Sequence, residues 1–174
     1  GVAKLKEFGD SVTKLKTFIG TSHVMVPDDH YSISKVYLRL EPSENRYYLL
    51  GGSFFSIKDA SFLTTPRTMQ DNELVTKIDA QIAQRFLDDR SMTLRAGLLE
   101  GKPGAGLDYT TSLHSNPLVF SLEGRGSWDD SRIHEAYDPF LLRAKADLTL
   151  FKYFHIVAGV NSLLERPRAM VGIG

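Results

Sequence analysis

The chain has 174 residues, of which 42% are hydrophobic and 24% are charged, a composition typical of a folded domain rather than a disordered one. Its 21 basic residues balance its 21 acidic residues, which excludes the strong positive field of a protein that gathers nucleic acid. The absence of cysteine excludes disulfides, thiol catalysis and thiolate metal sites.

The apolar runs and the first residue bear on targeting. No run is long enough for a transmembrane helix, and the residues after Gly1 do not form a signal-peptide pattern. Because the chain begins with glycine rather than methionine, we expect it to be part of a longer polypeptide. The missing signal therefore carries no information about the compartment.

Residues 1–20 have the periodicity of an amphipathic helix. Apolar residues recur at intervals of three and four, the spacing of a coiled-coil seam, and Gly20 would end the helix. The seam consists of Leu5, Phe8, Val12, Leu15 and Ile19. Such a helix either packs on its own domain or joins helices of other chains, and the second arrangement predicts a homo- or hetero-oligomer. Residues 21–31 are expected to form a linker.

From residue 32 onward the hydrophobic period changes to two. Apolar and polar residues alternate in about nine segments, which turn sequences separate and no helix-sized pattern interrupts. These segments are residues 32–41, 46–57, 74–86, 92–98, 105–109, 118–125, 140–150, 154–160 and 169–173. Longer polar loops are expected at residues 58–73 and 128–139. The sequence therefore predicts an all-β fold over residues 32–174, an antiparallel up-and-down β-barrel of the outer-membrane type with about 8–10 strands.

The clearest alternation lies in residues 140–150. There, apolar positions alternate with Arg143, Lys145, Asp147 and Thr149, a pattern that a strand can satisfy and a helix cannot. Eleven residues are also about the length that a tilted strand needs to cross a bilayer. An aromatic turn then leads into residues 154–160, so we expect an antiparallel hairpin.

Alternation alone does not decide which face of the barrel points inward, because soluble and membrane barrels share it with the faces exchanged. Two features favour apolar side chains outside. Glycines share the polar face with long charged residues, as Gly97 does beside Arg95 and Gly106 beside Asp108, which a narrow lumen requires. Aromatic residues also gather at strand ends, as in the interfacial girdles of membrane barrels. They are Phe86, Tyr109, Trp128, Tyr137, Phe140, Phe151, Tyr153 and Phe154.

This orientation predicts two sets of residues. The lipid-facing set consists of Ile78, Ile82, Leu94, Leu98, Leu107, Phe120, Leu122, Leu142, Leu148, Ile156 and Val171. The charge network that lines the lumen consists of Arg39, Lys77, Asp79, Arg95, Asp108, Glu123, Arg125, Arg143, Lys145 and Asp147. In a barrel of this size such a network fills the interior as ion pairs.

Three stretches carry a resemblance to a known family. Residues 85–109 (RFLDDRSMTLRAGLLEGKPGAGLDY) resemble a segment that follows the lipid-binding domain in some Gram-negative mammalian cell entry (MCE) family proteins. Residues 45–50 (NRYYLL) and 150–174 (LFKYFHIVAGVNSLLERPRAMVGIG) are similar to a strand and to the ending of the same family. The lipid-binding MCE domain itself is absent from the chain.

The resemblance implies an outer-membrane β-barrel module of an MCE-type phospholipid transport system, which anchors the complex at the outer membrane. It further implies membrane lipids and other lipid-transport components as partners, and a location in the outer membrane or periplasm of a Gram-negative cell envelope. The balanced charge adds the expectation that nucleic acid is not a partner. Two alternatives remain open from the residues themselves. One is a porin-like channel, and the other is a soluble lipocalin-like barrel that binds an apolar ligand inside.

An enzyme has little support in the sequence. The five histidines are scattered without metal-ligand spacing, and the glycine-rich residues 101–106 form a hairpin turn rather than a phosphate cradle. A pairing of Ser121 with His155 is a conjecture. We therefore predict no catalytic residues, no metal and no cofactor.

Overall fold

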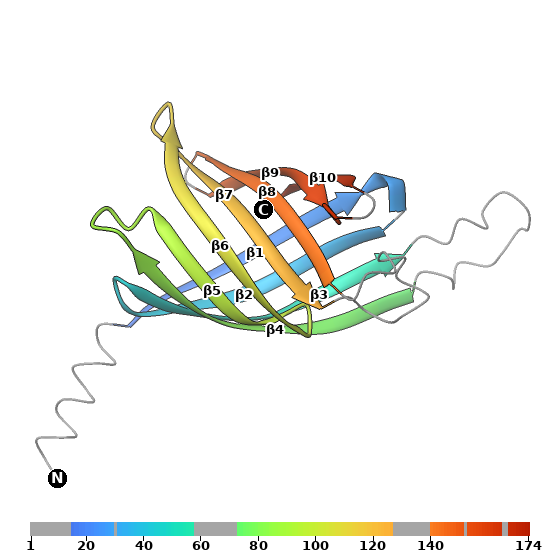
Figure 1. Ribbon diagram of the computed structural model, residues 1–174, viewed down its shortest axis with the longest axis horizontal. Coiled ribbons are helices and arrows are strands. Elements are labelled where there is room, and N and C mark those ends of the chain that lie inside the picture. The colour runs from blue at the N-terminus through green and yellow to red at the C-terminus, as the bar shows by residue number, and fades with distance from the viewer. Residues whose placement is uncertain (1–14, 30, 58–72, 127–139, 152, 165–166) are drawn as a thin grey trace, which may run out of the picture.

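Ten antiparallel strands form the fold, and each strand pairs with the next one along the chain (Figure 1). The computed structural model describes residues 15–29, 31–57, 73–126, 140–151, 153–164 and 167–174. The strands are β1 (Lys16–Val26), β2 (Tyr31–Ser43), β3 (Arg46–Ile57), β4 (Glu73–Phe86), β5 (Met92–Leu99), β6 (Lys102–Leu113), β7 (Asn116–Gly126), β8 (Phe140–Leu150), β9 (Phe154–Asn161) and β10 (Arg168–Ile173). A 3-10 turn, η1 (Pro27–Asp29), joins the first two strands.

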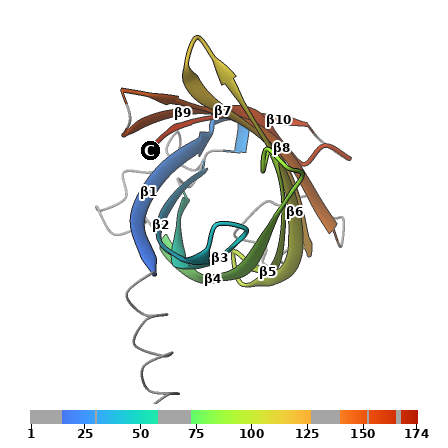
Figure 2. The same ribbon diagram turned by 90° about the vertical axis from the view of Figure 1, so that its left-hand side faces the viewer.

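Pairing between β1 and β10 closes the sheet into a barrel (Figure 2). The register at this seam runs from His23 opposite Ile173 to Met25 opposite Val171. The predicted all-β antiparallel barrel is therefore confirmed, with ten strands.

Two-residue turns set the register of the central strands. Glu100 and Gly101 connect β5 to β6, and His114 and Ser115 connect β6 to β7, all with positive φ angles between 50° and 75°. Positive φ at both central residues defines the type I′ turn, whose twist matches that of the strands it joins. The barrel thus has a loop end, which contains η1 and the β5–β6 turn, and a turn end, which contains the β6–β7 turn (Figure 1).

Rows of cross-strand pairs show which side chains share a face. One row passes from Arg95 through Gly106 and Glu123 to Arg143, and all four residues are on the inward face. The neighbouring row on the opposite face passes from Leu94 through Leu107 to Leu122. The inward face of the central strands is therefore charged, and the outward face is apolar.

Apolar side chains form a cluster in the interior at the loop end. The cluster consists of Val24, Val26, Tyr31, Ile33, Phe55 and Met170, with Val75 packed against it. Phe55 and Ile33 are among the most deeply buried side chains described. This cluster closes the loop end of the barrel beside the charged rows.

The expected N-terminal coiled-coil helix is not supported. Of its seam, Leu5, Phe8 and Val12 lie outside the described residues, and Leu15 immediately precedes β1. Lys16–Gly20 are strand, and Ile19 is exposed on the outward face. Backbone pairing of β1 with β2 at every position, together with the strand preference of β-branched and aromatic residues, overrides the helical spacing.

The expected linker at residues 21–31 is also wrong in extent. Strand β1 continues to Val26, η1 follows it directly, and β2 begins at Tyr31. The barrel therefore begins at Lys16 rather than at residue 32. The expected loops at residues 58–73 and 128–139 lie outside the described residues, except that Glu73 begins β4. Within the described ranges, no helix is long and apolar enough to cross a membrane.

Candidate functional site

The outer wall of the barrel, meaning the outward face of its ten strands, is dominated by apolar side chains. All eleven residues of the predicted lipid-facing set lie on it, as the register requires. Nine of them are exposed, Ile78 most of all at 66%, whereas Leu142 and Leu148 are half-buried. A water-soluble monomer rarely exposes contiguous apolar surface on this scale, so the outer wall is a candidate binding surface.

The outer wall also carries polar side chains over β1 and β2. There His23 Nδ1 and Ser34 Oγ lie 2.9 Å apart, in hydrogen-bond contact, on the outward face. Thr21 and Ser32 lie on the same face. Exposed apolar side chains lie beside them, since Met25 and Val171 face each other across the seam between β1 and β10 and are 46% and 52% exposed. The polar residues therefore interrupt the apolar surface near the seam without ending it.

The ten residues of the predicted charge network all lie on the inward face. Arg95 in β5 is the centre of one half of this network. Its guanidinium donates to Asp108 from Nε to Oδ2 at 2.6 Å and from Nη2 to Oδ1 at 2.8 Å. Nη2 also donates to Glu123 Oε1 at 2.8 Å. To reach Glu123 the side chain crosses β6 at Gly106, where a Cβ would lie 3.0 Å from Nη2. Glycine at that position therefore permits an ion pair between strands that are not neighbours.

Glu100 is the centre of the other half, although the alternation does not predict it as a lumen residue. It lies in the β5–β6 turn and is 1% exposed. Its carboxylate lies 2.9 Å from Arg143 Nη1, 2.6 Å from Arg125 Nη2 and 2.8 Å from Lys35 Nζ. Burial alone would raise the pKa of Glu100, but Arg143, Lys35 and Arg125 outweigh it and hold this pKa well below its usual value.

Glu123 connects the two halves. Its Oε1 accepts from Arg95 and lies 2.8 Å from Lys145 Nζ, while its Oε2 lies 3.8 Å from Arg143 Nη1. Since Lys35 reaches Glu100 from β2 and Arg143 reaches it from β8, the network spans the lumen. This arrangement is that of a filled interior rather than a wide channel.

Polar groups at the edge of the network are also bonded. Asp79 accepts from the backbone N–H of Glu100 at 2.8 Å and from the Ser53 hydroxyl. Arg143 Nε donates to Asn161, which itself donates to the Tyr31 hydroxyl in the apolar cluster. The charged network and the apolar cluster are thus joined through hydrogen bonds.

The remaining three predicted lumen residues are Arg39, Asp147 and Lys77. Arg39 Nε is 3.2 Å from Glu41 Oε1, and Asp147 Oδ1 is 3.0 Å from His155 Nδ1. Lys77 is inward-facing in β4. The conjectured pair of Ser121 with His155 is not among the hydrogen bonds of the described strands, since His155 bonds to Asp147 and Thr149. No group of three metal-ligating side chains is assembled within the described part of the chain.

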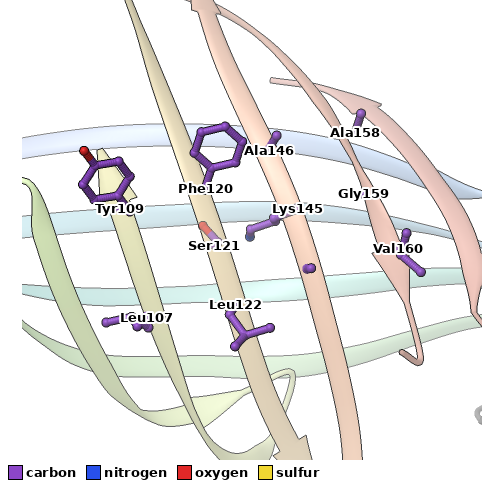
Figure 3. A pocket seen from close by; sticks show the side chains of 11 residues that line it. Leu107, Tyr109, Phe120, Ser121, Leu122, Lys145, Ala146, Ala158, Gly159 and Val160 are labelled. Carbon is purple, nitrogen blue, oxygen red and sulfur yellow. The ribbon is translucent and has the colours of Figure 1, made fainter. Parts of the chain in front are cut away.

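A groove of about 440 Å³ runs over β6 to β9 on the outer wall (Figure 3). It includes the middle of β8, where the outward residues Ala144 and Ala146 carry only a methyl group. Larger side chains of β6 and β7 form one side, and Ala158 and Val160 of β9 form the other. The side chains of β6 and β7 are Leu107, Tyr109, Phe120 and Leu122.

Comparison with known proteins gives one match. A family model described as a lipocalin-like domain matches residues 18–174. No curated protein and no solved structure matches the chain.

This match overturns the resemblance to the MCE family. Nothing in the comparisons indicates an MCE protein, so the prediction of an outer-membrane module of an MCE transport system, with a coiled coil, is wrong. The physical reason lies in the stretches that carried the resemblance. Residues 85–109 contain the end of β4, strand β5, a type I′ turn and most of β6, a pattern that any antiparallel barrel can contain.

Proposed function

Because the chain belongs to the lipocalin-like domain family, we propose that it is a lipid-binding barrel that holds hydrocarbon against its outer wall rather than in its interior. The observation that carries this proposal is the inverted polarity of the described strands. Leucine, isoleucine and phenylalanine side chains are exposed outside, while arginine, lysine and carboxylate side chains are paired inside.

The energetics favour contact between this wall and hydrocarbon. Fully burying a leucine-sized side chain is worth roughly 1.5–3 kcal/mol, and the outer wall presents many such side chains at 40–50% exposure, for example Leu94, Phe120 and Leu122. The interior offers no comparable gain, because Arg95, Glu100 and their partners already occupy it. Hydrocarbon therefore gains more outside the barrel than inside.

The experiment that tests the proposal is vesicle flotation. The purified chain is mixed with phosphatidylcholine vesicles and centrifuged through a density gradient at low and high salt. We expect the chain to float with the vesicles at both salt concentrations, because the formal net charge is zero and the contact is apolar. A chain that stays at the bottom and remains monodisperse without detergent would overturn the proposal.

A second candidate is a carrier that holds an apolar ligand inside the barrel. The family description and the apolar cluster at the loop end favour it. This candidate predicts that a fluorescent fatty acid binds at one molecule per chain without vesicles, and that Ile33→Ala alters its affinity. If Ile33→Ala binds the fatty acid with the affinity of the wild type, and substitutions on the outer wall change that affinity instead, the first proposal is favoured.

A further inference from the structure

We propose that the groove over β6 to β9 is a specific site for a single lipid acyl chain. The inference rests on the proposed function, since the groove is part of the apolar outer wall (Figure 3). It adds that one lipid is held in a defined place, whereas the rest of the wall contacts hydrocarbon without selection.

The shape of the groove follows from the side chains of three neighbouring strands. In the register, Phe120 lies opposite Ala146, which lies opposite Ala158. In the next outward row, Leu122 lies opposite Ala144. Two successive rows therefore step down from a large side chain on β7 to a methyl group on β8, which leaves a depression over Ala144 and Ala146.

The extent of the groove follows from the residues that line it. Two successive outward rows line it on each of the strands β6 to β9, and on β8 the lining consists of Ala144, Lys145 and Ala146. Two such rows lie roughly 7 Å apart along a strand, whereas four neighbouring strands cover roughly 14 Å across the sheet. The groove is thus longer across the strands than along them, and its volume of about 440 Å³ falls in the range of small-molecule sites.

The chemistry of the groove suits hydrocarbon and not a peptide. Strands β6 to β9 each pair on both edges, so their backbone groups are used within the sheet. An incoming peptide would find no strand edge to pair with, and its own N–H and C=O groups would be left without partners. Ser121 and Lys145, which also line the groove, belong to the inward face, and Lys145 Nζ contacts Glu123 there. Tyr109 brings one hydroxyl to the outward lining, and the other outward lining residues are apolar. An acyl chain has no polar groups to satisfy, so it is the occupant that fits.

The test compares leucines placed in the groove with a leucine placed elsewhere on the outer wall. Ala144→Leu combined with Ala146→Leu fills the groove, while Ala96→Leu adds one such side chain to β5, where Ala96 is also outward-facing and exposed. Each chain is loaded from phosphatidylcholine vesicles, washed in detergent and weighed by native mass spectrometry. We expect the wild type and Ala96→Leu to retain one phosphatidylcholine, and the groove variant to retain about tenfold less, since each excluded methylene weakens binding several-fold.

Equal retention by the groove variant and the wild type would overturn the inference, as would equal loss in Ala96→Leu. Flotation of the same chains separates this result from failure of the proposed function. If all three chains float but retention does not differ, only the groove is refuted. If the wild type does not float, the proposed function itself is refuted, and the inference that rests on it is refuted as well.

A second measurement covers the case in which the groove variant does not fold. Phe120→Trp lies on the groove and Leu94→Trp lies outside it, and both native side chains are 48% exposed. Trp128→Phe is added to each variant, so that the introduced tryptophan is the one source of tryptophan fluorescence. Each variant is mixed with a few molecules of brominated phosphatidylcholine per chain. We expect the tryptophan fluorescence of Phe120→Trp to be quenched more strongly than that of Leu94→Trp. Equal quenching at both positions would refute a selective site.

Discussion

The two faces of strand β7 carry opposite kinds of side chain. On its inward face, Glu123 is buried and bound to Arg95 and Lys145. On its outward face, Phe120 and Leu122 are exposed at 48% and 45%. A barrel that is stable in water shows the reverse, with apolar residues inside and charges outside. The comparison shows that, on β7, the apolar side chains that still lack contacts are on the outward face.

The interior differs from an ordinary apolar core in how it is stabilised. Buried charges contribute little net stability when paired, but removing one partner leaves the others uncompensated at high cost. Exposed apolar residues contribute to binding rather than to folding. Substitutions inside the barrel should therefore reduce stability, and substitutions outside should reduce lipid binding.

The largest effect is expected at Glu100. Glu100→Gln removes the carboxylate that Lys35, Arg125 and Arg143 share, and should lower the free energy of unfolding by about 3–5 kcal/mol. The measurement is urea-induced unfolding followed by circular dichroism. Glu44→Gln is the control, since the Glu44 partner Arg90 is exposed, and it should change stability by less than about 0.5 kcal/mol. Equal effects of the two substitutions would contradict a buried network.

A pair of neighbouring residues separates the two faces most directly. Ala146→Arg places a charge on the outer wall and should weaken binding to phosphatidylcholine vesicles by about 2–4 kcal/mol, measured by flotation at increasing lipid concentration. Lys145→Gln changes the inward face, where Lys145 is a quarter exposed, and should leave vesicle binding nearly unchanged. Similar tolerance at both positions would break the comparison between the faces.

The pH dependence of stability tests the interior alone. The pKa of Glu100 is held well below its ordinary value of 4.5, so ionised Glu100 stabilises the folded state at neutral pH. Because the unfolded chain takes up the proton first, this contribution is complete above about pH 5 and is lost as the pH falls through the folded pKa. Urea unfolding of the wild type should therefore weaken below pH 5, and Glu100→Gln should show a shallower decline. Parallel declines in the two chains would show that Glu100 is not the group responsible.

Strand alternation was sufficient to predict which residues share a face, but not where the barrel begins. A period of two fixes the face of every residue once the strands are assigned, as in Leu142 and Arg143 of β8. Residues 16–26 lack that pattern, because Gly20 and Ser22 are inward and Thr21 and His23 are outward. Their strand structure comes from pairing with β2, which is a tertiary contact and leaves no periodic signal in the sequence.

The interior network could be predicted in part. Its strand residues follow from alternation, but Glu100 lies in a turn, where a carboxylate is usually solvated. One signal was present, because the predicted lumen set contains six basic and four acidic residues. A buried set with excess positive charge needs further carboxylates. Glu100, next to Gly101 in a turn that returns the chain into the barrel, supplies one of them.

The smallest expected effect compares an inward with an outward glycine. In Gly106→Ala, the new Cβ would lie 3.0 Å from Arg95 Nη2, so the guanidinium must move by a few tenths of an ångström and its bond to Glu123 weakens. We expect a loss of about 1 kcal/mol in urea unfolding. In Gly52→Ala, the nearest atom is on the Phe54 ring at 3.4 Å, an ordinary contact on the outward face. That substitution should be neutral or slightly stabilising, since alanine restricts the unfolded chain more than glycine does. A greater loss at Gly52 than at Gly106 would mean that the outer wall, and not the paired interior, is the more tightly packed face.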